Sequence, residues 1–210
     1  MAWHPWVKRP KSAAVTARLD LARADLSTSH AAAITAALAE RDRTVRTPLS
    51  YEDALALVCK ATGWPVGHVW LRGDAGWRSG AWHDSGPEYA DLKAATVVTD
   101  MGAGRGIVAA VLYLEACRFL PGIEGLGSTV REQHAAALGL TAIVGVPVKG
   151  SGRVQAVFEF VTQADVEPGG ALADALLAIA DRARRGSGLV VAPNPRWLPP
   201  AVEPPLGLAG

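Results

Sequence analysis

The feature that most constrains the fold is residues 141–161, TAIVGVPVKGSGRVQAVFEFV, where two apolar runs flank a Lys-Gly-Ser-Gly-Arg turn. β-Branched residues on both sides of a glycine-containing turn are typical of a β-hairpin. The first run has hardly any polar side chain. In the second run, one alternating set is Val154, Ala156, Phe158 and Phe160, and the other is Gln155, Val157, Glu159 and Val161. Because both sets are mostly apolar, we expect a hairpin deep in a sheet that is covered on both faces.

The composition is that of a chain with a substantial core. Half of the 210 residues are hydrophobic, and the formal net charge is +1, so no global basic field draws the chain to nucleic acid. The basic start lacks the apolar run of a signal peptide, and no stretch approaches the ~20 apolar residues of a membrane helix. Two cysteines, Cys59 and Cys117, form neither a disulfide framework nor a metal-ligand cluster. We therefore expect a reduced, cytoplasmic protein without a nucleic-acid or membrane partner.

The chain divides into four expected segments. They are a loose arm (residues 1–11), an N-terminal helical segment (12–49), a folded domain (50–186) and a proline-rich tail (187–210). The helical segment has an apolar stripe of Val15, Leu19, Ala22 and Leu26. Ser27, Thr28 and Ser29 interrupt this stripe, and any of them could cap a new helix over residues 31–43.

Within residues 50–186, strand and helix patterns follow one another. Ser50 can cap a helix that ends at Gly63. Residues 66–72 and 77–83 are expected to form a second hairpin around a Gly-Asp-Ala-Gly turn. Further helices are expected around residues 89–94, 107–116, 129–138 and 171–185, and a short strand at residues 117–123.

This order of elements resembles the GAF domain, a small-molecule sensor fold of signalling proteins. The resemblance is carried by ALALVCKATGWPVGHVWL, GAGRGIVAAVLYLEACRFLP, AAALGLTAIVGVPVKGSGRVQAVFEF and ALADALLAIADRARR. These stretches look like the GAF domains attached to bacterial histidine kinases, phosphatases and diguanylate cyclases. The resemblance implies an α+β fold with a central antiparallel sheet in the order 2-1-5-4-3. It also implies helices on one face and, on the other, a loop-rich crossover that encloses a ligand pocket.

Departures from the family pattern bear on the cofactor, which stays unknown. Bilin-binding relatives carry a Cys-His pair, whereas Cys117 is followed by Arg118, so no covalent bilin is expected. The Asn-Lys-Phe-Asp-Glu motif of cyclic-nucleotide-binding relatives is absent, and two cysteines do not match the free methionine sulfoxide reductases. Some relatives hold haem through one histidine, for which His83 or His134 could serve, but a structural role is favoured for both.

Five residues are candidates for lining a ligand pocket. They are Trp70, Trp82, Phe119, His134 and Phe158. The aromatic members lie on or near the expected sheet, where core packing and pocket lining are compatible. His134 belongs to the polar run 131–134, which we interpret as a solvated helix face. His68 alternates with Trp70, so both should face the same side, and a lone histidine there favours a structural role.

The sequence brings together no nucleophile, base and orienting group, so we expect no enzymatic activity. We predict a sensory protein of signal transduction without its own output domain, with an unidentified small molecule and possible signalling protein as partners. One alternative is a dimerisation or scaffold module whose pocket is filled. Another is a redox enzyme that uses Cys117, because the neighbouring Arg118 could lower the pKa of its thiol.

The narrow apolar stripe of residues 15–26 suits a helix–helix seam between two copies of the chain. A homodimer through residues 12–46 is therefore expected. The alternative is that this helix folds back on its own domain.

Overall fold

The computed structural model describes residues 13–101, 104–164 and 169–187, and in the first helix it describes the side chains of Asp20 and of Ala22 onward. The expected arm, nearly all of the expected tail, and the side chains of Val15 and Leu19 lie outside the described residues. The strands are β1 (Val66–Gly73), β2 (Gly76–Asp84), β3 (Arg118–Pro121), β4 (Ala142–Gly150) and β5 (Arg153–Thr162). They form one antiparallel sheet in the order β2-β1-β5-β4-β3, which confirms the predicted fold class and strand order.

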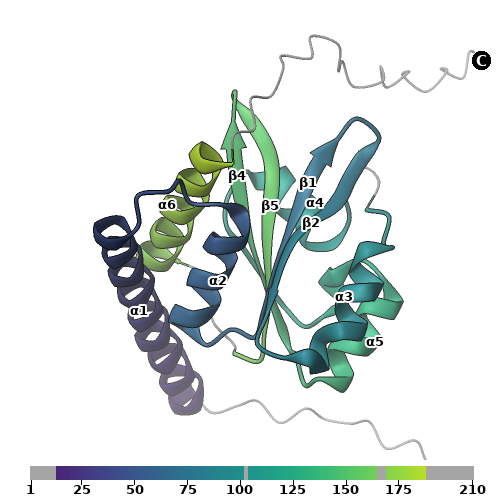
Figure 1. The fold of residues 1–210 in the computed structure, drawn as a ribbon. Coiled ribbons are helices and arrows are strands. Elements are labelled where there is room, and N and C mark those ends of the chain that lie inside the picture. The colour runs from purple at the N-terminus through teal and green to yellow at the C-terminus, as the bar shows by residue number, and fades with distance from the viewer. Residues whose placement is uncertain (1–12, 102–103, 165–168, 188–210) are drawn as a thin grey trace, which may run out of the picture.

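Helices lie on both faces of this sheet (Figure 1). They are α1 (Ala13–Thr44), α2 (Tyr51–Thr62), α3 (Ala90–Val97), α4 (Gly106–Leu114), α5 (Thr129–Ala137) and α6 (Gly170–Gly186). Two 3₁₀ turns, η1 (Pro87–Tyr89) and η2 (Glu124–Leu126), lie in the crossover between β2 and β4. None of the helices in the described parts of the chain is long and apolar enough to cross a membrane.

The central hairpin is β4 and β5, as the sequence predicts. Its loop residues Ser151 and Gly152 have φ values of 52° and 77°, and positive φ at both positions is the backbone of a tight two-residue hairpin turn. The register shifts next to this turn, so that Gln155 is an extra residue in β5. The expectation that Val154 shares a face with Phe158 is wrong, because this bulge places Val154 in the opposite core cluster.

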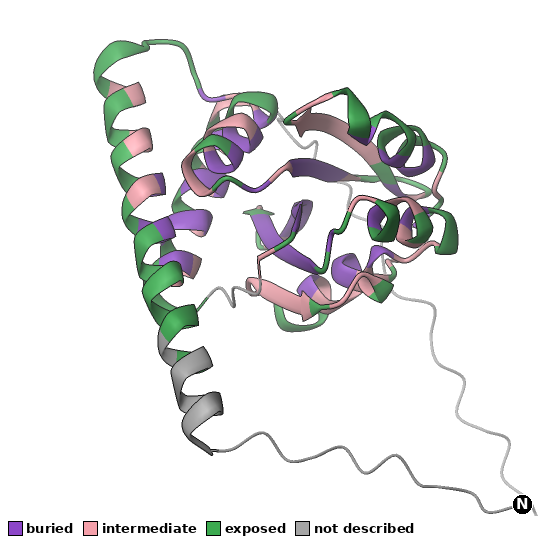
Figure 2. Ribbon diagram, turned by 90° about the horizontal axis from the view of Figure 1, so that it is seen from below, coloured by how far each residue is buried: buried purple, intermediate pink, exposed green. Residues whose placement is uncertain are grey.

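Both faces of the hairpin are covered, which confirms the expectation drawn from its apolar alternation. On one face, Val146 and Phe158 pack in a core with α1, α2 and α6. On the other face, Ile143 and Val157 pack in a second core with the crossover helices. Figure 2 shows the buried residues concentrated on the central strands and on the parts of the helices next to the sheet.

α1 is one continuous helix, so the expected break at residues 27–29 is wrong. The Thr28 hydroxyl donates to the Ala24 carbonyl at 2.9 Å, so this polar side chain is satisfied within the helix without a new cap. The second half of α1 packs on α2 and α6 through Ala31 and Ile34, which are buried. The described residues of its first half are mostly exposed, including Leu26 (Figure 2). The second half therefore folds back on its own domain.

Residues 50–186 begin and end at neighbouring points. Ser50 caps α2, as predicted, by accepting a hydrogen bond from the Asp53 backbone N–H at 3.0 Å. At the other end, Gly186 lies so close to the chain before α2 that an added Cβ would collide with the Leu49 carbonyl oxygen. Gly63 ends α2 with a φ of 72°, which confirms its predicted role as a stop.

Candidate functional site

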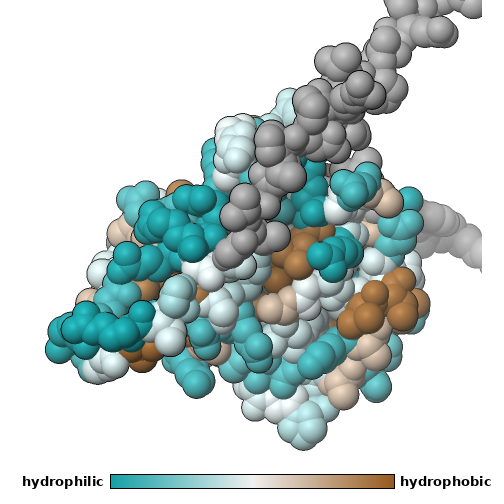
Figure 3. All heavy atoms as spheres, turned by 45° about the horizontal axis from the view of Figure 1, so that its top comes forward, coloured by the Kyte–Doolittle hydropathy of each residue, from teal (hydrophilic) through white to brown (hydrophobic). Residues whose placement is uncertain are grey.

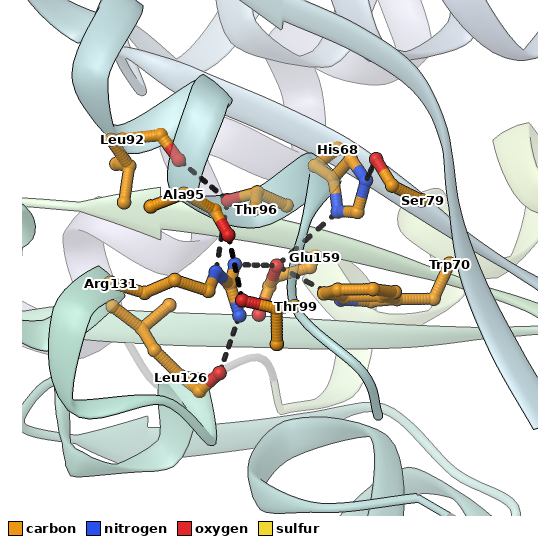
Figure 4. Close-up of polar contacts among 10 residues, drawn as sticks. All are labelled: His68, Trp70, Ser79, Leu92, Ala95, Thr96, Thr99, Leu126, Arg131 and Glu159. Carbon is orange, nitrogen blue, oxygen red and sulfur yellow. Dashed lines mark hydrogen bonds and ion pairs between the residues drawn. The ribbon is translucent and has the colours of Figure 1, made fainter. Parts of the chain in front are cut away.

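A charged cluster lies in the core between the sheet and the crossover, and its centre is Glu159 of β5 (Figure 4). Glu159 is fully buried, and its neighbours on the same face of the strand, Val157 and Val161, are apolar. The alternation of β5 forces the carboxylate inward, because residues two apart on a strand share a face. A buried carboxylate is costly unless partners compensate its charge.

Arg131 of α5 supplies the compensating charge. Its Nη2 donates to Glu159 Oε2 at 2.5 Å, its Nη1 donates to the Leu126 carbonyl at 2.5 Å, and its Nε donates to Thr96 Oγ1 at 2.9 Å. The Thr96 hydroxyl donates in turn to the Leu92 carbonyl at 2.7 Å. The guanidinium is fully buried, so its three partners replace the water that it lost on folding.

Two residues of β1 complete the cluster. Trp70 donates from Nε1 to Glu159 Oε2 at 3.0 Å, and the guanidinium of Arg131 lies 5.2 Å from the Trp70 ring centroid. His68 contacts Trp70 edge-on, with ring centroids 4.6 Å apart, so the two residues do face the same side of the sheet. His68 Nε2 and Ser79 Oγ of β2 are hydrogen-bonded at 2.9 Å.

Two polar atoms of the cluster have no hydrogen-bond partner. Glu159 Oε1 is buried and accepts no hydrogen bond, because Arg131 and Trp70 both donate to the other oxygen. His68 Nδ1 lies 3.4 Å from Glu159 Oε2 but makes no hydrogen bond. A group that donates a hydrogen bond would therefore find one free acceptor at the centre of this face.

Electrostatics keep the Glu159 carboxylate charged. Burial alone would raise its pKa, but Arg131, through its charge and its hydrogen bond, lowers the pKa to about 2, and the nearby His68 acts in the same direction. For His68, burial lowers the pKa from 6.5, although the nearby carboxylate acts in the opposite direction. The cluster at neutral pH is thus one ion pair beside a neutral imidazole.

The five predicted pocket residues do not share one site. Trp70 belongs to the cluster, and Trp82 lies beside it, with its ring centroid 5.4 Å from that of His68. Phe119 and Phe158 lie on the opposite face of the sheet, in the core that packs on α2 and α6. His134 is half-buried on α5. The structure therefore brings together two of the five.

The interpretation of residues 131–134 as a solvated helix face is wrong for Arg131, which is fully buried. The buried residues of α5 are Arg131 and Ala135, and their spacing of four places both on the side of the helix that faces the core. Sequence reasoning missed Arg131, Glu159 and Thr96 as parts of one site. The available signal was Glu159 itself, a carboxylate in a strand that was expected to be covered on both faces.

Burial keeps the thiols of both cysteines protonated. Burial raises the pKa of the Cys59 and Cys117 thiols to about 12, and for Cys117 the charge of Asp174 adds to this effect, outweighing Arg118. Both thiols are therefore protonated at neutral pH, which disfavours a nucleophilic role. In the described parts of the chain, no three His, Cys, Asp or Glu residues are grouped so that they could hold a metal ion.

Comparison with solved structures identifies the fold of this chain. Neither a protein-family model nor a curated protein sequence matches the chain. Among solved structures, the GAF domain of a phosphoenolpyruvate-protein phosphotransferase from Coxiella burnetii is similar, with a TM-score of 0.54 at 12% identity. This match covers 76% of this chain and 93% of that chain.

Two further structures give the same result. A structure described as that of the GAF domain matches with a TM-score of 0.53 at 10% identity, covering 78% of this chain and 95% of its own. The GAF domain of an Acinetobacter phosphoenolpyruvate-protein phosphotransferase matches with a TM-score of 0.50 at 15% identity, covering 76% and 90%. The chain that surrounds the buried Glu159–Arg131 cluster therefore has the GAF fold.

Proposed function

We propose that this protein is a sensory or regulatory domain of signal transduction that binds a small molecule between the sheet and the crossover. The observation that carries the proposal is the unpartnered, buried Glu159 Oε1. A buried acceptor without a donor destabilises the protein, and a ligand that donates a hydrogen bond to it removes this cost. The surrounding apolar and aromatic side chains, Trp70 among them, are typical of small-molecule sites with a few polar anchors.

The site requires movement before a ligand can reach it. Met101, Leu126 and Val157, which pack around the cluster, have no exposed surface. A ligand therefore binds a minor conformation in which the crossover has moved, and the bound population follows the difference in affinity between the two conformations. Ligand binding would thereby be coupled to a conformational change of the crossover, as a sensor requires.

The test is mass spectrometry of the purified full chain. The protein is desalted under native conditions and then denatured, and released compounds are compared between the parent and Glu159→Gln. We expect a released compound from the parent and at least about a tenfold loss in the variant, since an amide no longer offers a charged acceptor. Glu88→Gln, at an exposed position of η1, is the matched control and should retain the compound.

The second candidate function is a dimerisation or scaffold module with a filled pocket. It is favoured by Arg131, which already occupies the interior and satisfies one oxygen of Glu159. If no compound is released, and if fragments that carry hydrogen-bond donors leave the melting temperature unchanged, this second function replaces the first.

We infer further that the protein is not an enzyme and works in the cytoplasm. The protonated state of the Cys117 thiol argues against a cysteine-dependent redox activity and so supports the inference that the protein is not an enzyme. The two free cysteines of the described chain support a reducing compartment. An increase of peroxide or sulfoxide reduction in the presence of the protein, lost in Cys117→Ser, would contradict the first inference.

A further inference from the structure

The crossover consists of two parts that contact the sheet differently. α4 packs directly on the strands: a Cβ added to Gly145 of β4 would lie 2.5 Å from Ile107 Cγ1. α3 and α5 pack on each other; α3 also packs on β2 and η1, and α5 also packs on η2. In Figure 1 this pair of helices forms a separate group beside β1 and β2. We call α3 and α5 together the outer pair.

Arg131 connects the outer pair to the rest of the molecule. From α5, its guanidinium reaches Thr96 of α3, the Leu126 carbonyl at the end of η2, and Glu159 of β5. The ring of Trp70 from β1 lies against the same guanidinium. Four segments that are distant in sequence thus meet at one side chain, as Figure 4 shows.

We propose that the outer pair is a lid, and that Arg131 is the latch that holds it on the sheet. When the bond between Arg131 and Glu159 breaks, α3 and α5 move away together, while α4 stays packed on β4. Thr96 makes the two helices move as one, because its hydroxyl bonds both the guanidinium and its own helix. The opening exposes the Glu159 carboxylate without unfolding the sheet. Local openings of this kind occur in cooperative units below the energy of global unfolding.

A second ion pair between the sheet and the crossover provides a contrast. Lys149 of β4 and Glu115, just after α4, are 3.3 Å apart, but both side chains are about half exposed. Exposed ion pairs contribute little to stability, whereas removing one partner of a buried, multiply hydrogen-bonded pair is strongly destabilising. The latch therefore lies at Arg131 and not at the pair that joins α4 to β4.

Hydrogen–deuterium exchange of the full chain tests the latch. The variant is Arg131→Met with Glu159→Met, which replaces both charges by side chains of similar length and so avoids an unpaired buried charge. We expect amide exchange in α3 and α5 to become at least about tenfold faster, with α4, α2 and α6 within about twofold of the parent. The control is Lys149→Met with Glu115→Met, which should leave α3 and α5 unchanged.

Two outcomes overturn the proposal. One is unchanged exchange in α3 and α5 of the double variant. The other is equal acceleration in α2, α6 and the outer pair, which means that Arg131 supports the whole fold and not a lid.

If the double variant does not fold, the Thr96→Val variant provides the test of the latch. It removes the bond between Arg131 and α3 but keeps the ion pair, so exchange should accelerate in α3 and stay slow in α2 and α6. Unchanged exchange in α3 of Thr96→Val would contradict the latch.

Discussion

Among single residues, Glu159 and His68 both give up their protons more readily in the folded protein than in the unfolded chain. The pKa of Glu159 falls from 4.5 to about 2, because the partners Arg131 and His68 outweigh burial, and burial lowers the pKa of His68 from 6.5. As the pH falls, the unfolded state binds more protons than the folded state, so acid favours unfolding. The stabilisation from neutral His68 is lost first, and that from ionised Glu159 is lost as the pH falls from 4.5 to about 2.

We therefore expect the free energy of unfolding to decrease from neutral pH to about pH 3, as measured by urea denaturation. Glu159→Gln should remove the part of this decrease that lies below pH 4.5, which identifies its source. Equal pH profiles for the parent and the variant would show that other carboxylates cause the loss.

Phe158 tests the core on the other face of the sheet. Its ring is 1% exposed and packs edge-on against Tyr51 and Phe160, with centroids 5.5 and 6.4 Å away. Phe158→Ala should lower the free energy of unfolding by ~3–5 kcal/mol, since it leaves a cavity that the strands cannot close. Tyr113→Ala, at a residue that is 85% exposed, should change it by no more than ~0.5 kcal/mol. A Phe158→Ala protein that unfolds like the parent would contradict the assignment of this core.

Among the elements, α2 depends on its N-cap. Ser50 accepts a hydrogen bond from the Asp53 N–H, one of the donors that a helix start leaves without an internal partner. Ser50→Ala should therefore cost ~1 kcal/mol, measured by chemical denaturation. Ser27→Ala, within the continuous helix α1, should cost nothing measurable, because alanine is the better helix former. Similar losses in both variants would mean that the cap contributes no more than an ordinary helix position.

The elements were largely predictable because their signals are local. The alternation in residues 156–161 indicated the central hairpin, and Ser50 and Gly63 indicated the bounds of α2. The continuity of α1 was not predictable, since the second half of the helix is held by tertiary contacts of Ala31 and Ile34 that no local pattern shows.

The candidate site was not predictable to the same degree. Its bonds join residues far apart in sequence: Glu159 lies 28 positions from Arg131 and 89 positions from Trp70. An arginine beside glutamate and glutamine is compatible with a solvated helix, and only the crossover's path over the sheet turns Arg131 inward. Trp70 could be assigned to the site because aromatic residues on a central strand are candidates for any pocket on that face.

For the whole molecule, the prediction of a homodimer is still to be tested. The face seen in Figure 3 is mostly hydrophilic, with small separate hydrophobic patches, and offers no broad apolar surface. The first half of α1 projects from the domain and carries Leu26, which is 38% exposed. We expect a dimer that buries this half of α1 on both copies, as two-fold symmetry requires.

Light scattering at about 10⁻⁵ M, a concentration at which weak complexes form, checks this prediction. Leu26→Glu should produce a monomer, while Val130→Glu, an equally drastic change at an exposed position of α5, should not. A parent that is monomeric at this concentration ends the idea of a dimer. A Leu26→Glu protein that stays dimeric moves the interface away from α1.

The meeting of Gly186 with the chain before α2 has a consequence for protein engineering. Because residues 50–186 start and finish at neighbouring points, inserting them into a surface loop of an unrelated host would not force the host's two loop ends apart, provided that the core surface covered by Ala31 and Ile34 of α1 is also covered there. A host protein tolerates an inserted domain when the two ends of that domain are close together. In a reporter protein that carries residues 50–186 as such an insertion, a conformational change of these residues would act on the reporter at the one place where both of their ends join it.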